Sequence, residues 1–167
     1  MLRIFCTLAL AKLPVPFFDC GVMHNHEIEI LIVEDNRYDA ELTIRALKKQ
    51  NLANKLIHLS DGAEALEFLF ATGKYASRNP EVVPRVVFLD LKMPKVDGIE
   101  VLKAIKSDPR TRTIPVVILT SSAEDPDIKK CYLMGANSYI VKPVEFENFA
   151  RIVSDLGLYW IVINKTL

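Results

Sequence analysis

Strand-length runs of mainly apolar residues alternate with segments in which apolar residues recur at helical spacing. The strand-length runs lie at 30–33, 55–59, 86–89, 116–119 and 139–141. The helical segments lie at 37–50, 61–69, 98–107, 127–134 and 146–159. Continuous apolar runs of this length are typical of strands buried on both faces, and amphipathic helices between them would cover those faces. The pattern therefore predicts an α/β domain built on a doubly wound, five-stranded parallel sheet.

Polar residues near the ends of these segments support the predicted boundaries. Asn36 is a candidate N-cap of the first helix, because an Asn side chain can accept a hydrogen bond from a free N–H group of the first turn. Asp61 and Glu64 have the spacing of a capping box at the start of the second helix. The connection 72–85 is polar and contains one glycine and two prolines, so we expect a long loop there.

The first 26 residues do not share this alternation. The apolar run 4–11 loosely resembles a signal peptide, but Lys12 and two nearby prolines interrupt it before it reaches the ~20 residues that a membrane span needs. Met23 is a second plausible start. We therefore predict a leader at 1–26, either disordered or due to a mis-assigned start, followed by one domain at 27–158.

Residues 159–167 extend past the last predicted helix and begin with the sequence Tyr-Trp-Ile-Val. These large apolar side chains would form either an exposed patch for dimerisation or a segment that folds back onto the core. We predict a C-terminal tail at 159–167, and both placements of its side chains stay open.

The composition is that of a globular protein without a charge bias. Hydrophobic residues make up 50% of the chain, and 21 Lys and Arg residues balance 21 Asp and Glu residues. We expect neither a nucleic-acid partner nor a membrane partner, because binding to nucleic acid needs clustered positive charge and no such run occurs. The three cysteines lack Cys-x-x-Cys spacing, which argues against a zinc site and favours a cytoplasmic location.

Chemically reactive side chains stand at the carboxyl ends of the predicted strands. Glu34 and Asp35 follow the first strand, Asp90 the third, Thr120 the fourth and Lys142 the fifth. Open α/β sheets bind their ligands at this edge. Three carboxylates there suit a hard divalent cation such as magnesium, and an Asp carboxylate can act as a nucleophile toward phosphorus. A hydroxyl and an ammonium beside them would stabilise charge on a transferring phosphoryl group.

Four stretches of the sequence carry a known set of motifs. They are Ile-Val-Glu-Asp-Asn at 32–36, Val-Phe-Leu-Asp-Leu-Lys-Met-Pro-Lys-Val-Asp-Gly at 87–98, Val-Val-Ile-Leu-Thr-Ser-Ser at 116–122 and Gly-Ala-Asn-Ser-Tyr-Ile-Val-Lys-Pro at 135–143. Over about 27–158 the chain resembles the response regulator receiver domain, the CheY-like family of two-component signalling. The resemblance implies a flavodoxin-like (β/α)5 fold. It also implies a single-domain response regulator that signals through a phosphorylation-dependent protein interaction and is not an enzyme with a separate substrate.

The resemblance assigns roles to the acidic residues. It implies that Asp90 accepts a phosphoryl group from a phosphohistidine on a sensor histidine kinase or on a His-containing phosphotransfer protein. Asp35, Asp90 and the backbone carbonyl of Lys92 would bind Mg²⁺ directly, and Glu34 would act through a bound water. The implied cofactor is therefore Mg²⁺.

The resemblance also assigns roles to the other strand ends. Thr120 and Lys142 would bind the phosphoryl oxygens, and Tyr139 would be the switch aromatic that turns inward as Thr120 moves. The bond from Lys142 to Pro143 would be cis. The readout would be the face formed by the fourth helix, the fifth strand and the fifth helix, which responds to the added charge.

Several positions depart from the family's common pattern. Glu34 stands where an aspartate is frequent, and Lys92 and Ser122 occupy positions that influence how quickly the phosphoryl group is lost. The long connection 72–85 and the ending at 156–160 resemble stand-alone regulators that include partners of bacterial phytochrome kinases. The kinase partner implied by this resemblance is thus of phytochrome type. A second copy of the chain is a further expected partner only if the apolar ending forms an exposed patch.

Three other functions stay open on the residues alone. A receiver-like binding module that works without phosphorylation would keep the same fold. A phosphatase with an aspartate nucleophile needs a second acid two residues after it, where this chain has Lys92. A flavodoxin-like cofactor binder needs a glycine- or hydroxyl-rich phosphate loop after the first strand, where this chain has the acidic turn 34–37.

Overall fold

A computed structural model describes residues 30–52, 55–142 and 146–164. The five strands are β1 (Ile30–Val33), β2 (Leu56–Leu59), β3 (Val86–Leu89), β4 (Val116–Thr120) and β5 (Ser138–Val141). They form one parallel sheet in the order β2-β1-β3-β4-β5. This order places the switch in winding direction between β1 and β3, where open sheets of this kind bind ligands.

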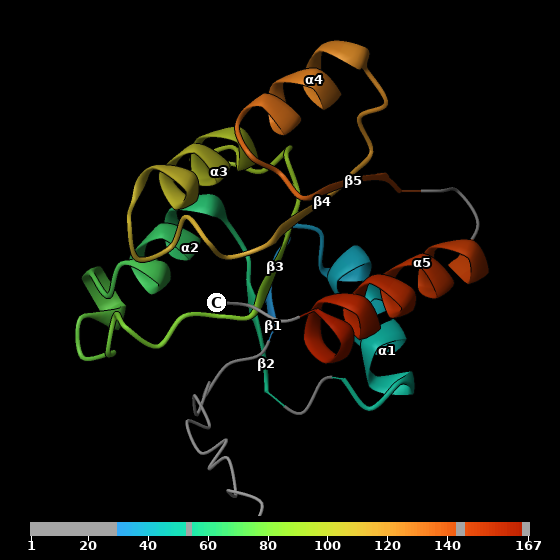
Figure 1. The fold of residues 1–167 in the computed structure, drawn as a ribbon, viewed down its shortest axis with the longest axis horizontal. Coiled ribbons are helices and arrows are strands. Elements are labelled where there is room, and N and C mark those ends of the chain that lie inside the picture. The colour runs from blue at the N-terminus through green and yellow to red at the C-terminus, as the bar shows by residue number, and fades with distance from the viewer. Residues whose placement is uncertain (1–29, 53–54, 143–145, 165–167) are drawn as a thin grey trace, which may run out of the picture.

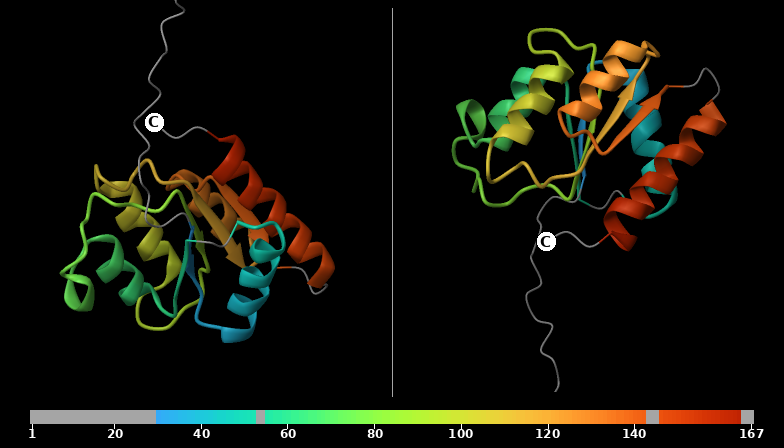
Figure 2. Two further views of the ribbon diagram at one scale, coloured as in Figure 1. Left: turned by 90° about the horizontal axis from the view of Figure 1, so that it is seen from below. Right: turned by 45° about the horizontal axis from the view of Figure 1, so that its top comes forward.

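Five helices connect the strands and cover both faces of the sheet. They are α1 (Arg37–Lys49), α2 (Gly62–Leu69), α3 (Gly98–Ser107), α4 (Asp125–Leu133) and α5 (Phe146–Leu158). Figure 1 shows α1 and α5 on one side of the sheet and α2 and α3 on the other, and Figure 2 shows the same layers from two further directions. The predicted doubly wound, five-stranded parallel fold is confirmed.

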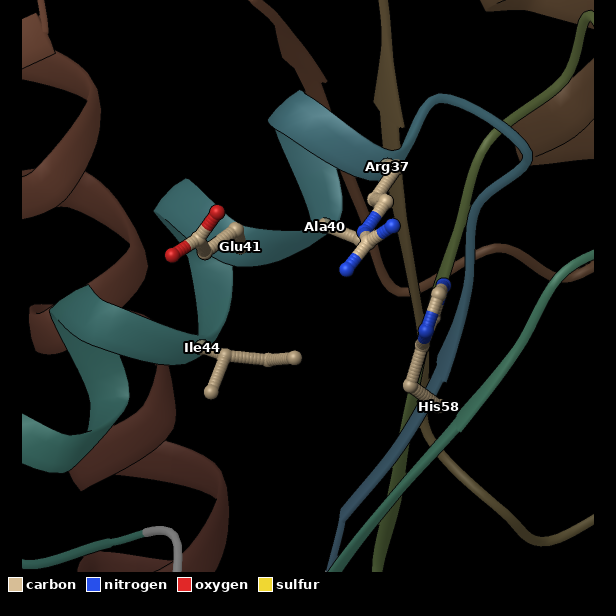
Figure 3. A pocket seen from close by; sticks show the side chains of 5 residues that line it. All are labelled: Arg37, Ala40, Glu41, Ile44 and His58. Carbon is tan, nitrogen blue, oxygen red and sulfur yellow. The ribbon is translucent and has the colours of Figure 1, made fainter.

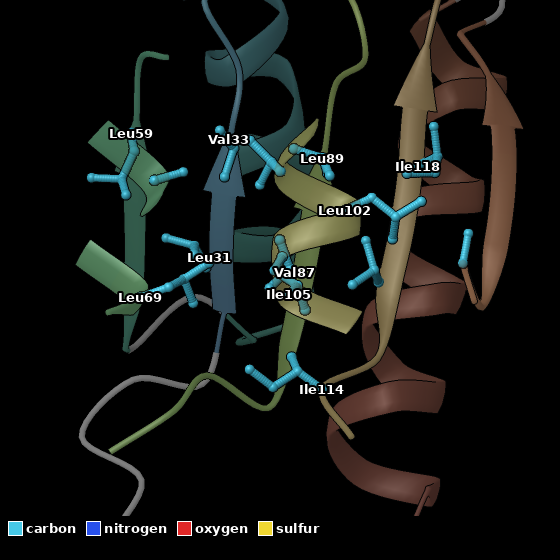
Figure 4. Packing of buried hydrophobic residues seen from close by; sticks show 14 of the residues in the cluster. Leu31, Val33, Leu59, Leu69, Val87, Leu89, Leu102, Ile105, Ile114 and Ile118 are labelled. Atoms are coloured by element: carbon cyan, nitrogen blue, oxygen red, sulfur yellow. The ribbon is translucent and has the colours of Figure 1, made fainter. Parts of the chain in front are cut away.

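The alternation of side chains along the strands divides the core into two layers. Along β1, Leu31 and Val33 pack toward α2 and α3, and Ile30 and Ile32 pack toward α1 and α5. Figure 4 shows the first of these layers, in which Leu102 and Ile105 of α3 lie over the central strands. Because every β1 residue is buried, the strand needs apolar side chains on both faces, as its continuous apolar run predicts.

The predicted boundaries hold with small differences. The helix expected at 127–134 begins two residues earlier, at Asp125, because Pro126 fits the first turn of α4, where its missing N–H would be unpaired in any residue. The predicted loop 72–85 contains a short 3-10 helix, η1 (Gly73–Tyr75). The Tyr75 hydroxyl donates to Glu64 Oε1 of α2 at 2.8 Å, which ties this connection to the helix before it.

The chain continues past α5 as a π-helical turn, η2 (Tyr159–Ile163). Ile161 is buried and Trp160 packs against the α1 and α5 layer. Tyr159, Val162 and Ile163 remain exposed. The apolar residues of this segment are therefore divided between the core and the surface.

Two expectations fall on residues that the structure does not describe. They are the leader 1–26 and the cis bond before Pro143. Within the described ranges, no helix is both long enough and apolar enough to cross a membrane.

Close backbone packing fixes the loop that follows β3. The N–H of Gly98 donates to the Leu91 carbonyl at 2.8 Å, and a Cβ atom on Gly98 would lie 2.0 Å from the carbonyl oxygen of Asp90. A second contact involves Gly62, whose Cβ would lie 2.2 Å from the Val96 carbonyl oxygen. Both positions need glycine because any side chain would collide with backbone. The loop after Asp90 is thus held against α2 and α3.

Candidate functional site

The acidic residues predicted from the strand ends come together at one edge of the sheet. Glu34 and Asp35 follow β1, Asp90 follows β3, and one carboxylate oxygen of each lies within 4.8 Å of those of the other two. The backbone holds them in place, since the N–H of Asp90 donates to the Val33 carbonyl at 3.0 Å. Glu34 and Asp90 are buried, and Asp35 is exposed to solvent. The cluster therefore opens to solvent on the side of Asp35.

Lys142 reaches the same cluster from the end of β5. Its N–H donates to the Thr120 carbonyl at 2.7 Å, which extends the pairing of β4 and β5 by one residue. Its Nζ atom lies 2.6 Å from Glu34 Oε2, 2.9 Å from Asp39 Oδ2 and 3.7 Å from Asp90 Oδ1. The first two distances are hydrogen bonds and the third is a longer ion pair. The ammonium is therefore held by two carboxylates and faces a third.

Asp39 is a residue that the sequence reasoning missed. It lies in the first turn of α1, where an acidic side chain is favourable simply because it faces the positive end of the helix dipole. Because this explanation is sufficient for an acidic residue in a first turn, the sequence gives no reason to expect its contact with Lys142, which is 103 residues away in the chain. The one available signal is that α1 starts directly after Glu34 and Asp35, so its first turn must lie beside the acidic edge.

Burial sets the protonation behaviour of the acidic edge. It raises the pKa of Glu34 to about 7, although the hydrogen bond and the charge of Lys142 act in the opposite direction. Burial also raises the pKa of Asp90, opposed by the Lys142 charge. For Lys142, burial alone would lower the pKa, but the hydrogen bonds and charges of its acidic partners outweigh burial and raise it. One ammonium thus faces an excess of carboxylates.

The acidic edge fits a divalent cation. Asp90 Oδ1 is buried and has no hydrogen-bond partner, which leaves an acceptor oxygen available beside the other two acids. Hard cations such as Mg²⁺ prefer oxygen ligands of this kind, and a cation there would offset the repulsion among the carboxylates. Lys92 lies in the loop after β3 with an exposed side chain, and the role expected of its backbone carbonyl stays a prediction.

A hydrogen-bonded chain connects Thr120 to Tyr139. Thr120 is fully buried, and its Oγ1 atom accepts a hydrogen bond from the N–H of Ser122 at 3.2 Å. The Ser122 carbonyl accepts from the Tyr139 hydroxyl at 3.0 Å, and the Ser122 hydroxyl donates to Asp127 of α4 at 2.7 Å. Ser122 therefore contacts the predicted phosphoryl-binding threonine, the predicted switch tyrosine and α4. Asp127 was not foreseen, because an acidic residue in a first helical turn has an ordinary explanation.

A shallow hollow of about 250 Å³ lies between α1 and β2. Its lining residues are Arg37, Ala40, Glu41, Ile44 and His58. Figure 3 shows the Arg37 guanidinium extending from α1 toward the His58 ring on β2. His58 Nε2 lies 2.8 Å from the Glu34 carbonyl oxygen, so this side chain supports the backbone that presents Glu34.

The fold and the convergent acidic edge define a class of signalling protein. Residues 30–154 match the family model described as the response regulator receiver domain, and the chain belongs to this family. It is a receiver homologous to two-component response regulators, which signal through phosphorylation.

Known relatives match most of the chain. The probable methanogenesis regulatory protein FilR2 of Methanothrix harundinacea is 41% identical over 137 residues, which cover 82% of this chain and 86% of the relative. Response regulator Rcp1 of Synechocystis sp. is 36% identical over 132 residues, covering 79% and 88%.

Two solved structures are also similar. The Mn²⁺-bound form of Rcp1 matches with a TM-score of 0.77 at 34% identity, covering 84% of this chain and 99% of that one. The bacteriophytochrome response regulator AtBRR matches with a TM-score of 0.65 at 50% identity, covering 83% and 98%. The predicted resemblance to phytochrome-associated receivers is confirmed.

Proposed function

We propose that Asp90 accepts the phosphoryl group and that Glu34, Asp35, Asp90 and the Lys92 carbonyl hold Mg²⁺ beside it. One observation carries this proposal. Asp90 is buried beside two other acids, and its Oδ1 atom has no hydrogen-bond donor and lies 3.7 Å from the Lys142 ammonium. An unpartnered buried carboxylate oxygen is costly for stability, which is the expected condition of a group retained for chemistry.

The transfer needs one bond to form and one to break. An oxygen of the Asp90 carboxylate attacks the phosphorus of a phosphohistidine on the partner, the P–N bond breaks, and the electron pair stays on the imidazole nitrogen. Bound Mg²⁺ would supply positive charge to the phosphoryl oxygens during this step. Lys142 and Thr120 would donate hydrogen bonds to the same oxygens, so both side chains would stabilise the negative charge that develops on the phosphoryl group during transfer. The product is an acyl phosphate on Asp90, whose hydrolysis the same residues would support.

Thr120 and Tyr139 supply the route by which the phosphoryl group would change the surface. If the Thr120 hydroxyl turns toward a phosphoryl oxygen, its hydrogen bond from Ser122 must change, and Ser122 also holds Tyr139 and α4. The responding surface would then be the α4, β5 and α5 face. Two arrangements of this face, with the phosphoryl group favouring one of them, are sufficient for signalling.

The partners follow from the same proposal. The donor would be a sensor histidine kinase, of phytochrome type by similarity to AtBRR, or a His-containing phosphotransfer protein. A homodimer is supported by exposed apolar side chains at the end of α5 and in η2, which are Leu158, Tyr159, Val162 and Ile163. The absence of a nucleic-acid partner and of a membrane partner, together with a cytoplasmic location, stays a prediction from composition.

Incubation with Mg²⁺ and a small acyl phosphate donor, followed by intact mass measurement, tests this function. Wild type should gain the mass of one phosphoryl group, and Asp90→Asn should gain none. A matched control is Asp97→Asn, which changes an exposed aspartate of the same loop that caps α3 and should leave uptake unchanged. Uptake by Asp90→Asn would refute the assignment, and no uptake by wild type would favour a receiver-like module that works without phosphorylation.

A further inference from the structure

The Lys142 ammonium also hydrogen-bonds a carboxylate outside the acidic cluster, that of Asp39. Of its three acidic neighbours, Glu34 and Asp90 belong to the cluster that fits a divalent cation, whereas Asp39 does not. Asp39 approaches from α1, and its carboxylate is about one-third exposed, at 30%. The ammonium is therefore drawn toward α1 as well as toward the cluster.

This placement affects access to the cluster, because Lys142 is itself a cation. An ammonium that moved closer to Asp90 could hydrogen-bond the unpartnered Oδ1 atom, which now lies 3.7 Å away. It would then neutralise the same carboxylates that a divalent cation must bind. A positive charge within a few ångströms of the metal position also repels the metal directly. Under the proposed function, Lys142 would thus both bind the phosphoryl group and compete with the metal for the carboxylates.

Asp39 is well placed to limit this competition. Its backbone is fixed in the first turn of α1, where its N–H donates to the Asn36 side chain at 3.4 Å and its carbonyl accepts from the Thr43 hydroxyl at 3.0 Å. The carboxylate therefore projects from a rigid base. Its 2.9 Å hydrogen bond to Lys142 occupies one of the three ammonium donors.

We propose that Asp39 is a positioning residue that holds the Lys142 ammonium back from Asp90 and so keeps the acidic cluster open to a divalent cation. The inference rests on the proposed function, since it concerns the same metal site. It assigns Asp39 a task beyond stabilising the start of α1. Asp39 acts through Lys142 and does not itself bind the metal.

Titration calorimetry with Mg²⁺ on the full chain, at one pH and one ionic strength, tests this inference. Asp39→Asn should weaken Mg²⁺ binding by about tenfold, the size expected from the loss of one charge-assisted hydrogen bond. The matched control is Glu41→Gln, which removes the same charge from the same helix at a residue paired with Arg45 and not with Lys142. It should change the affinity by about twofold or less.

Repeating the Asp39 substitution in a protein that lacks the Lys142 ammonium shows whether Asp39 acts through Lys142 or only through its own negative charge. In Lys142→Met protein the competing ammonium is absent, so adding Asp39→Asn should change Mg²⁺ affinity by about threefold or less. Asp39→Ala provides a second variant and should behave as Asp39→Asn does. Asp39→Glu retains the carboxylate and should recover part of the lost affinity.

The outcomes separate the inference from the function on which it rests. Equal effects of Asp39→Asn and Glu41→Gln, or the same loss with and without Lys142, would overturn the role of Asp39 while wild type still binds Mg²⁺ and takes up phosphate. Failure of the proposed function would instead appear in wild type, as no Mg²⁺ binding or as phosphate at a residue other than Asp90.

Discussion

Two half-buried lysines lie at opposite ends of the sheet and have opposite surroundings. Lys142, at the carboxyl edge, contacts three carboxylates. Lys106 of α3 lies near the amino ends of β4 and β5, and its Nζ atom donates to the Ile114 carbonyl at 2.7 Å, to the Arg112 carbonyl at 3.3 Å and to the Asn137 side chain at 3.2 Å. All three hydrogen-bond partners of Lys106 are neutral. Lys142 therefore has more negative than positive charge around it, whereas Lys106 bonds to no charged group.

The pKa values of the two lysines record this difference. Burial lowers the pKa of Lys106, because its neutral partners do not compensate for the lost hydration. Burial acts on Lys142 in the same direction, but its acidic partners reverse the outcome. At its end of the sheet, Lys106 uses all three N–H donors of its ammonium in hydrogen bonds. The edge around Lys142 keeps an unbalanced charge and an unpartnered oxygen, which is the condition for binding a metal and a phosphoryl group.

Removing the positive charge of Lys142 from the acidic edge should have the largest effect on phosphoryl uptake. Lys142→Met is expected to slow phosphoryl uptake from a small acyl phosphate by about 100-fold or more, because one donor to the developing charge is lost. A time course of intact mass at saturating Mg²⁺ measures the rate. Lys106→Met is the matched control at the other end and should react at the wild-type rate. Equal rates of phosphoryl uptake for Lys142→Met and Lys106→Met would contradict the claim that only the acidic edge of the sheet takes part in phosphoryl transfer.

The protonation of Glu34 should make the stability of the metal-free protein depend on pH. The folded carboxyl titrates near 7 and the unfolded one near 4.5, so between these values the folded state binds the extra proton. The stability that this group contributes is complete below pH 4.5 and is lost as pH rises through 7, by about 3 kcal/mol in total.

Urea unfolding of wild type and Glu34→Gln across this pH range measures the effect of Glu34. The stability of wild type relative to the variant should fall as pH rises, because the Gln side chain does not titrate. A constant difference between the two proteins from pH 4.5 to pH 7 would show that burial does not govern Glu34.

Removing the Lys106 ammonium, at the end of the sheet away from the acidic edge, should lower the free energy of unfolding and leave phosphoryl uptake unchanged. Lys106→Met removes the donor to two backbone carbonyls and to Asn137, and unpaired groups of this kind cost about 2 kcal/mol. Chemical denaturation gives the free energy of unfolding, which should fall by that amount while phosphoryl uptake stays at the wild-type level. A stable variant that no longer takes up phosphate would contradict the separation of roles.

An exposed ion pair provides the smallest expected effect. Glu41 and Arg45 are one turn apart on α1, with side chains 54% and 65% exposed. Solvent screens such pairs, so Glu41→Gln should change the free energy of unfolding by about 0.5 kcal/mol or less. Thermal and urea unfolding should agree on this value. A larger loss would mean that charge on α1 matters for reasons other than contact with Lys142.

The fold could be predicted from the sequence because its signals are local. Strands such as β3 are apolar on both faces, and caps such as Asn36 and Asp61 mark the helix starts, with side chains that accept from first-turn N–H groups in the structure. The acidic edge was predictable too, since parallel strands bring their carboxyl ends together. Each of these inferences needs only the residues of one element and the rules of parallel sheets.

The missed residues depend on contacts between distant segments. Asp39 meets Lys142 and Asp127 meets Ser122 through side chains on helices, and nothing in the spacing of a first-turn acid shows which strand end it faces. The division of the segment after α5 between core and surface depends on the π-helical turn, which alters the spacing expected of an α-helix. These features are set by packing.

Chemical mapping of the phosphorylated residue tests the central claim most directly. Borohydride reduces an acyl phosphate but leaves free carboxylates unchanged, so phosphorylated protein can be reduced, digested and analysed by mass spectrometry. The reduced residue should be Asp90, converted to homoserine, and no other. Reduction at Asp35, or a phosphorylated protein with no reduced carboxyl at all, would contradict the assignment of Asp90 as the phosphoryl acceptor.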